Sequence, residues 1–96
     1  MSIYVTLYKF TDQGIRNIKD SPKRLDAAIK AFEEKGGKLL GAYYTVGEYD
    51  LLVIGEMENE EVGLAHTIAT VSMGNVRSTS LRAYTPAQFA KILEKV

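Results

Sequence analysis

The sequence predicts a single α+β domain whose elements follow the order βαββαβ, with one further helix at the end. Segments rich in β-branched and aromatic residues alternate with segments of helical periodicity, and glycine or proline marks most of the changes. The chain of 96 residues is long enough for one domain with a modest core. Neither an internal repeat nor a low-complexity linker divides it.

The first third of the chain predicts a strand and two helical segments. Residues 3–10 are β-branched and aromatic, which is typical of a strand. Thr11 is placed to cap a short helical turn, and a Ser-Pro pair at 21–22 starts a longer helix that a Gly-Gly pair at 36–37 ends. Helical spacing gives the longer helix an apolar stripe of Leu25, Ala28, Ile29 and Phe32.

The middle of the chain predicts a hairpin and a third helix. Residues 38–46 and 49–56 have the composition of two strands. The connection Gly47-Glu48 suits a two-residue type II′ turn, which favours Gly in its first position. Asn59 then caps a helix over residues 60–73.

The last part of the chain predicts a fourth strand, over residues 76–84, and a terminal helix. Thr85 is the N-cap of this helix, Pro86 takes its first position, and Gln88 completes a capping box. An apolar stripe follows at helical spacing, formed by Phe89, Ile92, Leu93 and Val96. We expect this stripe to dock on the body of the domain.

Right-handed crossovers close this order into a ferredoxin-like fold, with a four-stranded antiparallel sheet of order 4-1-3-2 and two helices on one face. A sheet with one wet face alternates apolar and polar residues. The run from Leu51 to Ile54 is instead apolar on both sides. We therefore expect a second copy of the chain to cover the other face, which gives a homodimer or a higher multiple of dimers.

Composition excludes several classes of function. Twelve basic residues balance twelve acidic ones, so there is no basic excess for nucleic acid. The absence of cysteine excludes disulfides and thiolate chemistry. No apolar run approaches the roughly 18 residues of a membrane helix, and the first residues do not resemble a signal peptide, so we expect a cytoplasmic protein. No spacing of metal ligands or phosphate loop is present, and we expect neither a metal nor a cofactor.

Three separated blocks of the sequence resemble the GYD domain family. The blocks are residues 9–15 with 17–22, the Gly-x-Tyr-Asp signature at 47–50, and residues 74–77 with 79–83. The resemblance covers almost the whole chain. It implies the dimeric α/β-barrel architecture, in which two ferredoxin-like sheets pack face to face, and it implies no particular activity.

Asp50 is the candidate closest to a site. It opens an otherwise apolar strand, so a partly buried carboxylate there needs a partner. The topology places Lys9 and Arg77 at the same edge of the sheet, where they predict a small polar site for an anionic or carbonyl-bearing ligand. The structural alternative is that Asp50 caps the hairpin or pairs with Lys9.

The remaining candidates are aromatic or basic. His66, the only histidine, lies beside the helical stripe of Val62, Ala65 and Ala69 and is the only possible histidine acid or base. Tyrosines on the sheet predict either an apolar cleft with hydroxyl groups or a core and subunit interface. Arg82 suits a ligand carboxylate or an ion pair with Glu56. The full set of candidate ligand-binding residues is Asp50, Tyr49, Lys9, Arg77, Tyr8, Tyr44, His66 and Arg82.

Three kinds of function stay open at this point. The first is a non-catalytic module that binds a small molecule or a partner protein. The second is a cofactor-free enzyme, like a monooxygenase or isomerase, acting on a small organic substrate in the cleft, and it rests on analogy of fold alone. The third is a purely structural subunit of an assembly.

Overall fold

The computed structural model describes residues 1–96 and has the predicted order of elements. The strands are β1 (Ser2–Phe10), β2 (Lys38–Tyr44), β3 (Leu51–Met57) and β4 (Val76–Ala83). The helices are α1 (Asp12–Arg16), the 3₁₀ turn η1 (Ile18–Asp20), α2 (Ser21–Glu34), α3 (Glu60–Ser72) and α4 (Pro86–Leu93). None of these helices is both long and apolar enough to cross a membrane.

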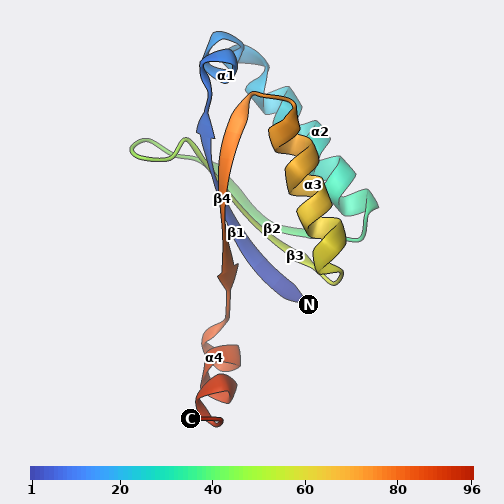
Figure 1. The fold of residues 1–96 in the computed structure, drawn as a ribbon, viewed down its shortest axis with the longest axis vertical. Helices are drawn as coiled ribbons and strands as arrows, with labels where there is room; N and C mark the ends of the chain where they lie inside the picture. Colours follow the sequence, from blue (N-terminus) through green and yellow to red (C-terminus); the bar gives the residue numbers. More distant parts are fainter.

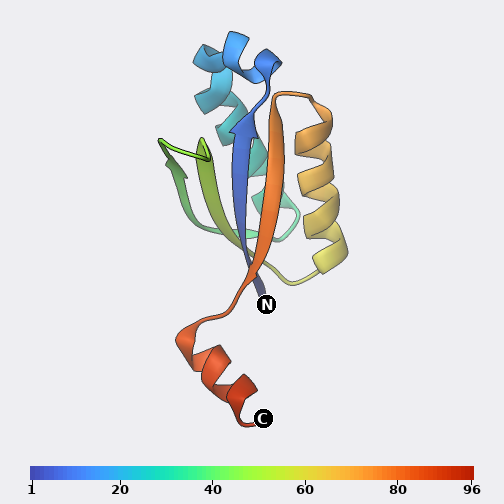
Figure 2. The same cartoon turned by 60° about the vertical axis from the view of Figure 1, so that its left-hand side comes forward.

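The four strands form one antiparallel sheet of order β2-β3-β1-β4, which confirms the predicted ferredoxin-like topology. Helices α2 and α3 lie side by side on one face of this sheet (Figures 1 and 2). The predicted caps at Asn59 and Thr85 form. The Asn59 side chain accepts hydrogen bonds at the start of α3, and the Thr85–Gln88 capping box is complete at the start of α4.

The strand register divides the side chains between two faces. On β1, Tyr4, Thr6, Tyr8 and Phe10 point toward α2 and α3. The other parity leaves an apolar surface without a helix over it, which we call the open face. The open face carries Ile3, Val5 and Leu7 on β1, Tyr43 on β2, Leu52 and Ile54 on β3, and Leu81 on β4. The polar side chains of Lys9, Glu56, Arg77 and Thr79 lie on the same side of the sheet.

The predicted two-residue hairpin turn is wrong. Tyr44 pairs with Leu51, so the connection between β2 and β3 has residues 45–50. Thr45 closes this loop with two hydrogen bonds, from its backbone N–H to the Asp50 carbonyl (2.9 Å) and from its hydroxyl to the Tyr49 carbonyl (2.6 Å). Asp50 also donates its own N–H to the Tyr8 carbonyl (2.9 Å), so the end of the loop is attached to β1 as well.

The predicted docking of the terminal helix is also wrong. Helix α4 projects beyond the end of the sheet and away from α2 and α3 in both views (Figures 1 and 2). Its apolar stripe is uncovered, with Phe89 52% and Leu93 53% exposed. The direction of the chain explains this, because Arg82 fixes the residues that leave β4. Its guanidinium lies 4.4 Å from the centre of the Tyr84 ring and donates to the carbonyls of Ile3 and Ala83.

Candidate functional site

A cavity of about 560 Å³ lies between the sheet and the two helices that cover it. Few side chains in the chain are fully buried, because the space between the layers is incompletely filled. The helices bring small residues to this space, namely Ala27, Ala28 and Ala31 from α2 and Gly63 from α3. The ring of Phe32 packs directly on Gly55 of β3, and a Cβ added to Gly55 would lie 3.0 Å from that ring. Phe32 therefore sets the distance between α2 and the sheet at this point.

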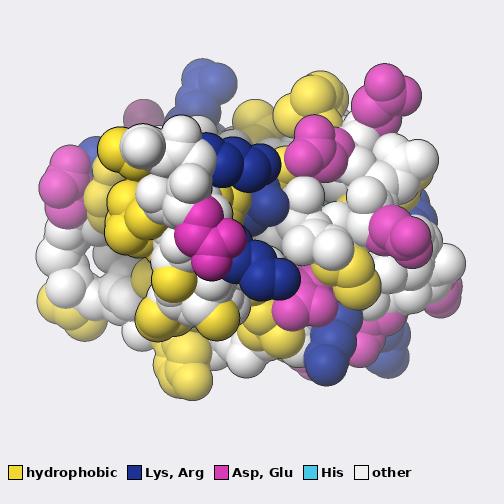
Figure 3. Space-filling view, turned by 90° about the horizontal axis from the view of Figure 1, so that it is seen from below, with side chains coloured by type: hydrophobic (Ala, Val, Ile, Leu, Met, Phe, Trp, Pro, Cys, Tyr) yellow, Lys and Arg dark blue, Asp and Glu magenta, His cyan; other side chains and the backbone are white.

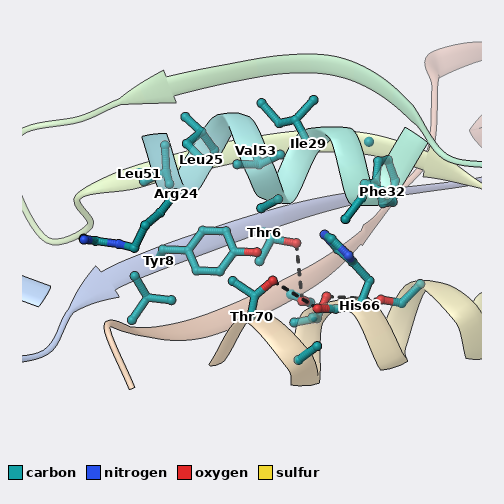
Figure 4. Close-up of a pocket in the computed structure, with 18 of the residues that line it drawn as sticks. Thr6, Tyr8, Arg24, Leu25, Ile29, Phe32, Leu51, Val53, His66 and Thr70 are labelled. Carbon is teal, nitrogen blue, oxygen red and sulfur yellow. Dashed lines mark hydrogen bonds between the residues drawn. The ribbon is translucent and has the colours of Figure 1, made fainter. Parts of the chain in front are cut away.

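The walls of the cavity are mainly apolar, with a few polar groups among them. Leu25, Ile29 and Val53 provide aliphatic surface (Figure 4). Thr6 shares a hydrogen bond of 3.5 Å with Ser80 across the sheet. An apolar enclosure with a small number of polar groups is the usual composition of a small-molecule site.

Burial favours the neutral form of two side chains in the cavity lining, Tyr8 and His66. Burial raises the pKa of the Tyr8 phenol above its ordinary value. Burial also lowers the pKa of the His66 imidazole, and the positive charge of Lys35 lowers it further. The His66 ring lies 5.4 Å from the ring of Phe32, centre to centre, in a tilted arrangement. At neutral pH the cavity therefore offers an uncharged phenol and an uncharged imidazole.

Arg24 is one of two cationic residues in the cavity lining, and Lys35 is the other. Arg24 comes from the first turns of α2 and lies at the Tyr8 end of the cavity (Figure 4). Its Nη1 donates to the Asn17 carbonyl at 2.9 Å, which holds the guanidinium in place. Its Nη2 is buried and has no hydrogen-bond partner. Beside it, Ser21 and Tyr44 share a hydrogen bond of 2.9 Å. A buried donor without an acceptor is costly, so this end of the cavity favours a ligand that brings one.

The structure divides the predicted site residues into three groups. Tyr8 and His66 line the cavity. Lys9 lies opposite Arg77 in the pairing of β1 with β4, and its ammonium stands 5.3 Å from the centre of the Tyr49 ring. Arg82 lies near the opposite end of β4, against Tyr4 and Tyr84, and hydrogen-bonds backbone carbonyls.

Asp50 accepts a hydrogen bond of 2.8 Å from the backbone N–H of Phe10. The predicted need for a partner is met, although the donor belongs to β1 and not to the hairpin turn. This contact supports the structural alternative for Asp50, because the carboxylate fastens the loop before β3 to the end of β1.

Thr6, Arg24 and Thr70 are among the cavity residues that sequence reasoning did not single out. Thr6 has a usable signal, because it shares the strand face of Tyr4 and Tyr8. Arg24 precedes the apolar stripe of α2 and has the pattern of an ordinary solvated arginine. No cluster of three carboxylate or imidazole side chains is placed to hold a metal ion.

The family model described as the GYD domain matches residues 4–93. The chain belongs to the GYD domain family. In this GYD domain, parts of the blocks that carried the resemblance contact one another at the end of the sheet where β1 ends and β4 begins. Thr11 donates its backbone N–H to the Asn75 carbonyl (3.0 Å) and its hydroxyl to the Gly74 carbonyl (2.5 Å). Gly14 packs against the backbone of Asn75 so closely that no Cβ would fit. Together with the hydrogen bond from Phe10 to Asp50, these bonds show that residues of the signature blocks hold the end of β1 to the segments before β3 and β4.

Two solved structures are similar to this GYD domain. The crystal structure of FFRP-DM1 matches with a TM-score of 0.57 and 22% identity, over 88% of this chain and 100% of that one. The crystal structure of TTHA0845 from Thermus thermophilus matches with a TM-score of 0.53 and 22% identity, over 88% of this chain and 95% of that one. At this level of identity the likeness shows the fold alone. No curated protein matches the sequence.

Proposed function

We propose that this GYD domain protein is a non-catalytic binding module, and that its ligand is a small molecule held between the sheet and helices α2 and α3. The observation that carries the proposal is the cavity itself. Its volume of about 560 Å³ lies within the usual range of small-molecule sites, roughly 300–1,000 Å³. A void of this size without an occupant loses packing contacts on every side, so a ligand that fills it stabilises the fold.

The lining also indicates the class of ligand, an apolar body with an anionic or carbonyl group at one end. Leu25, Ile29 and Val53 suit the apolar body. The unpartnered Nη2 of Arg24 suits the polar group, because a guanidinium donates strong hydrogen bonds to carboxylates. We therefore propose that the anionic or carbonyl group of the ligand binds at Arg24 rather than near Asp50, where the sequence predicted it.

We also propose that the module is a homodimer through the open face. Seven apolar or aromatic side chains of the open face lie on all four strands, with Thr79 among them and with Lys9, Glu56 and Arg77 toward the ends of the strands. Such a surface is larger than the scattered apolar residues that monomers normally expose. The formal net charge of zero gives little repulsion between two copies.

The ligand proposal is tested with two probes of equal chain length, decanoate and decanol. Binding is followed by amide chemical shifts, which locate each probe at the cavity or elsewhere. We expect decanoate to bind at the cavity about tenfold or more tightly than decanol, because a hydrogen bond to a charged group contributes about 1.5–3 kcal/mol. Arg24→Gln should remove that preference, whereas Lys23→Gln, on the exposed side of the same turn, should keep it.

A second variant tests the cavity itself. Ala28→Phe fills the space from α2, so it should abolish binding of both probes and raise the melting temperature, because the void is replaced by packed side chain. Ala65→Phe, on the exposed side of α3, is the matched control and should leave binding intact. Probes that shift only residues of the open face, or that bind Ala28→Phe as well as the natural chain, would contradict the proposal.

A further inference from the structure

We infer that helix α4 is an exchanged arm, which docks its apolar face on the open face of a second copy of the chain. The inference goes beyond ligand binding and rests on the proposed dimer, in which the arm covers the part of the partner's open face that the opposing sheet leaves free. Four apolar side chains of the terminal segment are exposed, namely Phe89, Ile92, Leu93 and Val96. Hydrophobic side chains gather without cover at the end of the molecule from which α4 projects (Figure 3).

The length of α4 is the first argument. The helix has eight residues, and isolated helices shorter than about 12–15 residues are marginal in water. Its complete capping box contributes only about 1 kcal/mol. Since α4 makes hardly any contact with its own body, its stability has to come from packing against another surface.

The exit of the chain from β4 is the second argument. Arg82 stacks on Tyr84 and donates to the Ile3 and Ala83 carbonyls, so the connection between β4 and α4 is held at the end of the sheet. Thr85 continues in extended conformation and begins the helix beyond that end. The arm is therefore held away from its own open face while its apolar stripe stays available to another chain (Figure 1).

The area of the open face is the third argument. The two shortest strands, β2 and β3, have seven residues each. Four strands of that length, about 4.8 Å apart, cover an outline of roughly 19 by 23 Å, or about 440 Å². Stable interfaces of standard size bury about 800 Å² per partner. An eight-residue helix adds an outline of about 120 Å² to the copy that donates it, beyond the outline of its own open face. The arms thus bring the interface closer to the standard size.

The test uses the absence of cysteine from the natural chain. A nitroxide is attached to Lys91→Cys, on the polar side of α4, and this full chain is mixed with natural chain labelled with ¹⁵N. We expect the nitroxide to broaden the amide signals of Val5, Ile54 and Leu81 in the labelled copy. The same label on Lys30→Cys, on the exposed side of α2, should leave these signals sharp.

A pair of charge variants measures the contribution of the arm. Leu93→Glu should weaken the dimer by about tenfold or more, because burial of a leucine is lost and a charge is placed in the contact. Ala87→Glu, on the opposite side of α4, should leave it unchanged. If Leu93→Glu remains dimeric and the nitroxide on α4 broadens no amide signals of the open face, the exchange of the arm is wrong but the dimer stands. A natural chain that is monomeric would overturn both.

Discussion

At the scale of single residues, Asp50 shows how a signature residue can be structural. Its carboxylate accepts the Phe10 N–H at 2.8 Å where β1 ends. We expect Asp50→Ala to lower the free energy of unfolding by about 1–3 kcal/mol, because the Phe10 N–H loses its acceptor. Asp50→Asn, which keeps an acceptor oxygen, should lose less. Urea unfolding measures both, and an unchanged midpoint for Asp50→Ala would show that the contact contributes nothing to stability.

His66 makes stability depend on pH in a predictable direction. Because burial and Lys35 lower its pKa in the folded chain, the unfolded chain binds more protons below its own pKa of about 6.5. The contribution of His66 is therefore complete above about pH 6.5 and is lost as the pH falls through the folded pKa. Unfolding free energies compared at pH 7.5 and 5.5, about one unit on either side of that value, should show a loss that His66→Gln reduces. An NMR titration that puts the His66 pKa above its ordinary value would contradict this.

At the scale of the elements, amphipathic pattern decided what the sequence could predict. The stripe of α2, from Leu25 to Phe32, faces the sheet as expected, because apolar and charged residues alternate clearly on that helix. Helix α3 is ambiguous. It turns Gly63, His66, Thr67 and Thr70 toward the cavity and leaves Leu64 exposed. The predicted stripe of Val62, Ala65 and Ala69 is therefore only partly right, because Ala69 lines the cavity and Ala65 is exposed. His66 was placed at the border of that stripe rather than at the cavity.

The loop between β2 and β3 and the arm α4 were mispredicted for a related reason. Local sequence describes the preferences of a turn or a cap, and both the Gly-Glu pair and the Thr85 capping box are good local signals. Tertiary bonds then decide the outcome. Asp50 ties the loop to β1, and Arg82 directs the chain out of β4. Arg24 belongs to the same class, because only the folded chain shows that its Nη2 is buried.

At the scale of the whole molecule, alternate side chains of β1 face two surfaces for which we propose different functions. Residues on the side of Tyr8 line the cavity, and residues on the side of Leu7 form the open face. A sheet strand with apolar residues on both sides therefore does not distinguish a ligand site from a dimer interface until the position of the helices is known. The tyrosine side chains of β1 face α2 and α3, and its aliphatic side chains lie on the open face.

This separation gives a direct test of the dimer. Leu7 lies in the centre of the open face, between Leu52 on β3 and Thr79 on β4. Leu7→Glu should convert the dimer to a monomer, because a carboxylate in the centre of an apolar contact would be buried without a partner. The variant should keep the far-ultraviolet circular dichroism of the natural chain, since Leu7 faces away from the helices. Ala65→Glu adds the same charge on the exposed side of α3 and should stay dimeric. Light scattering at micromolar concentration decides the matter. If the natural chain has the mass of one copy, or if Leu7→Glu stays dimeric, the copies do not join through the open face.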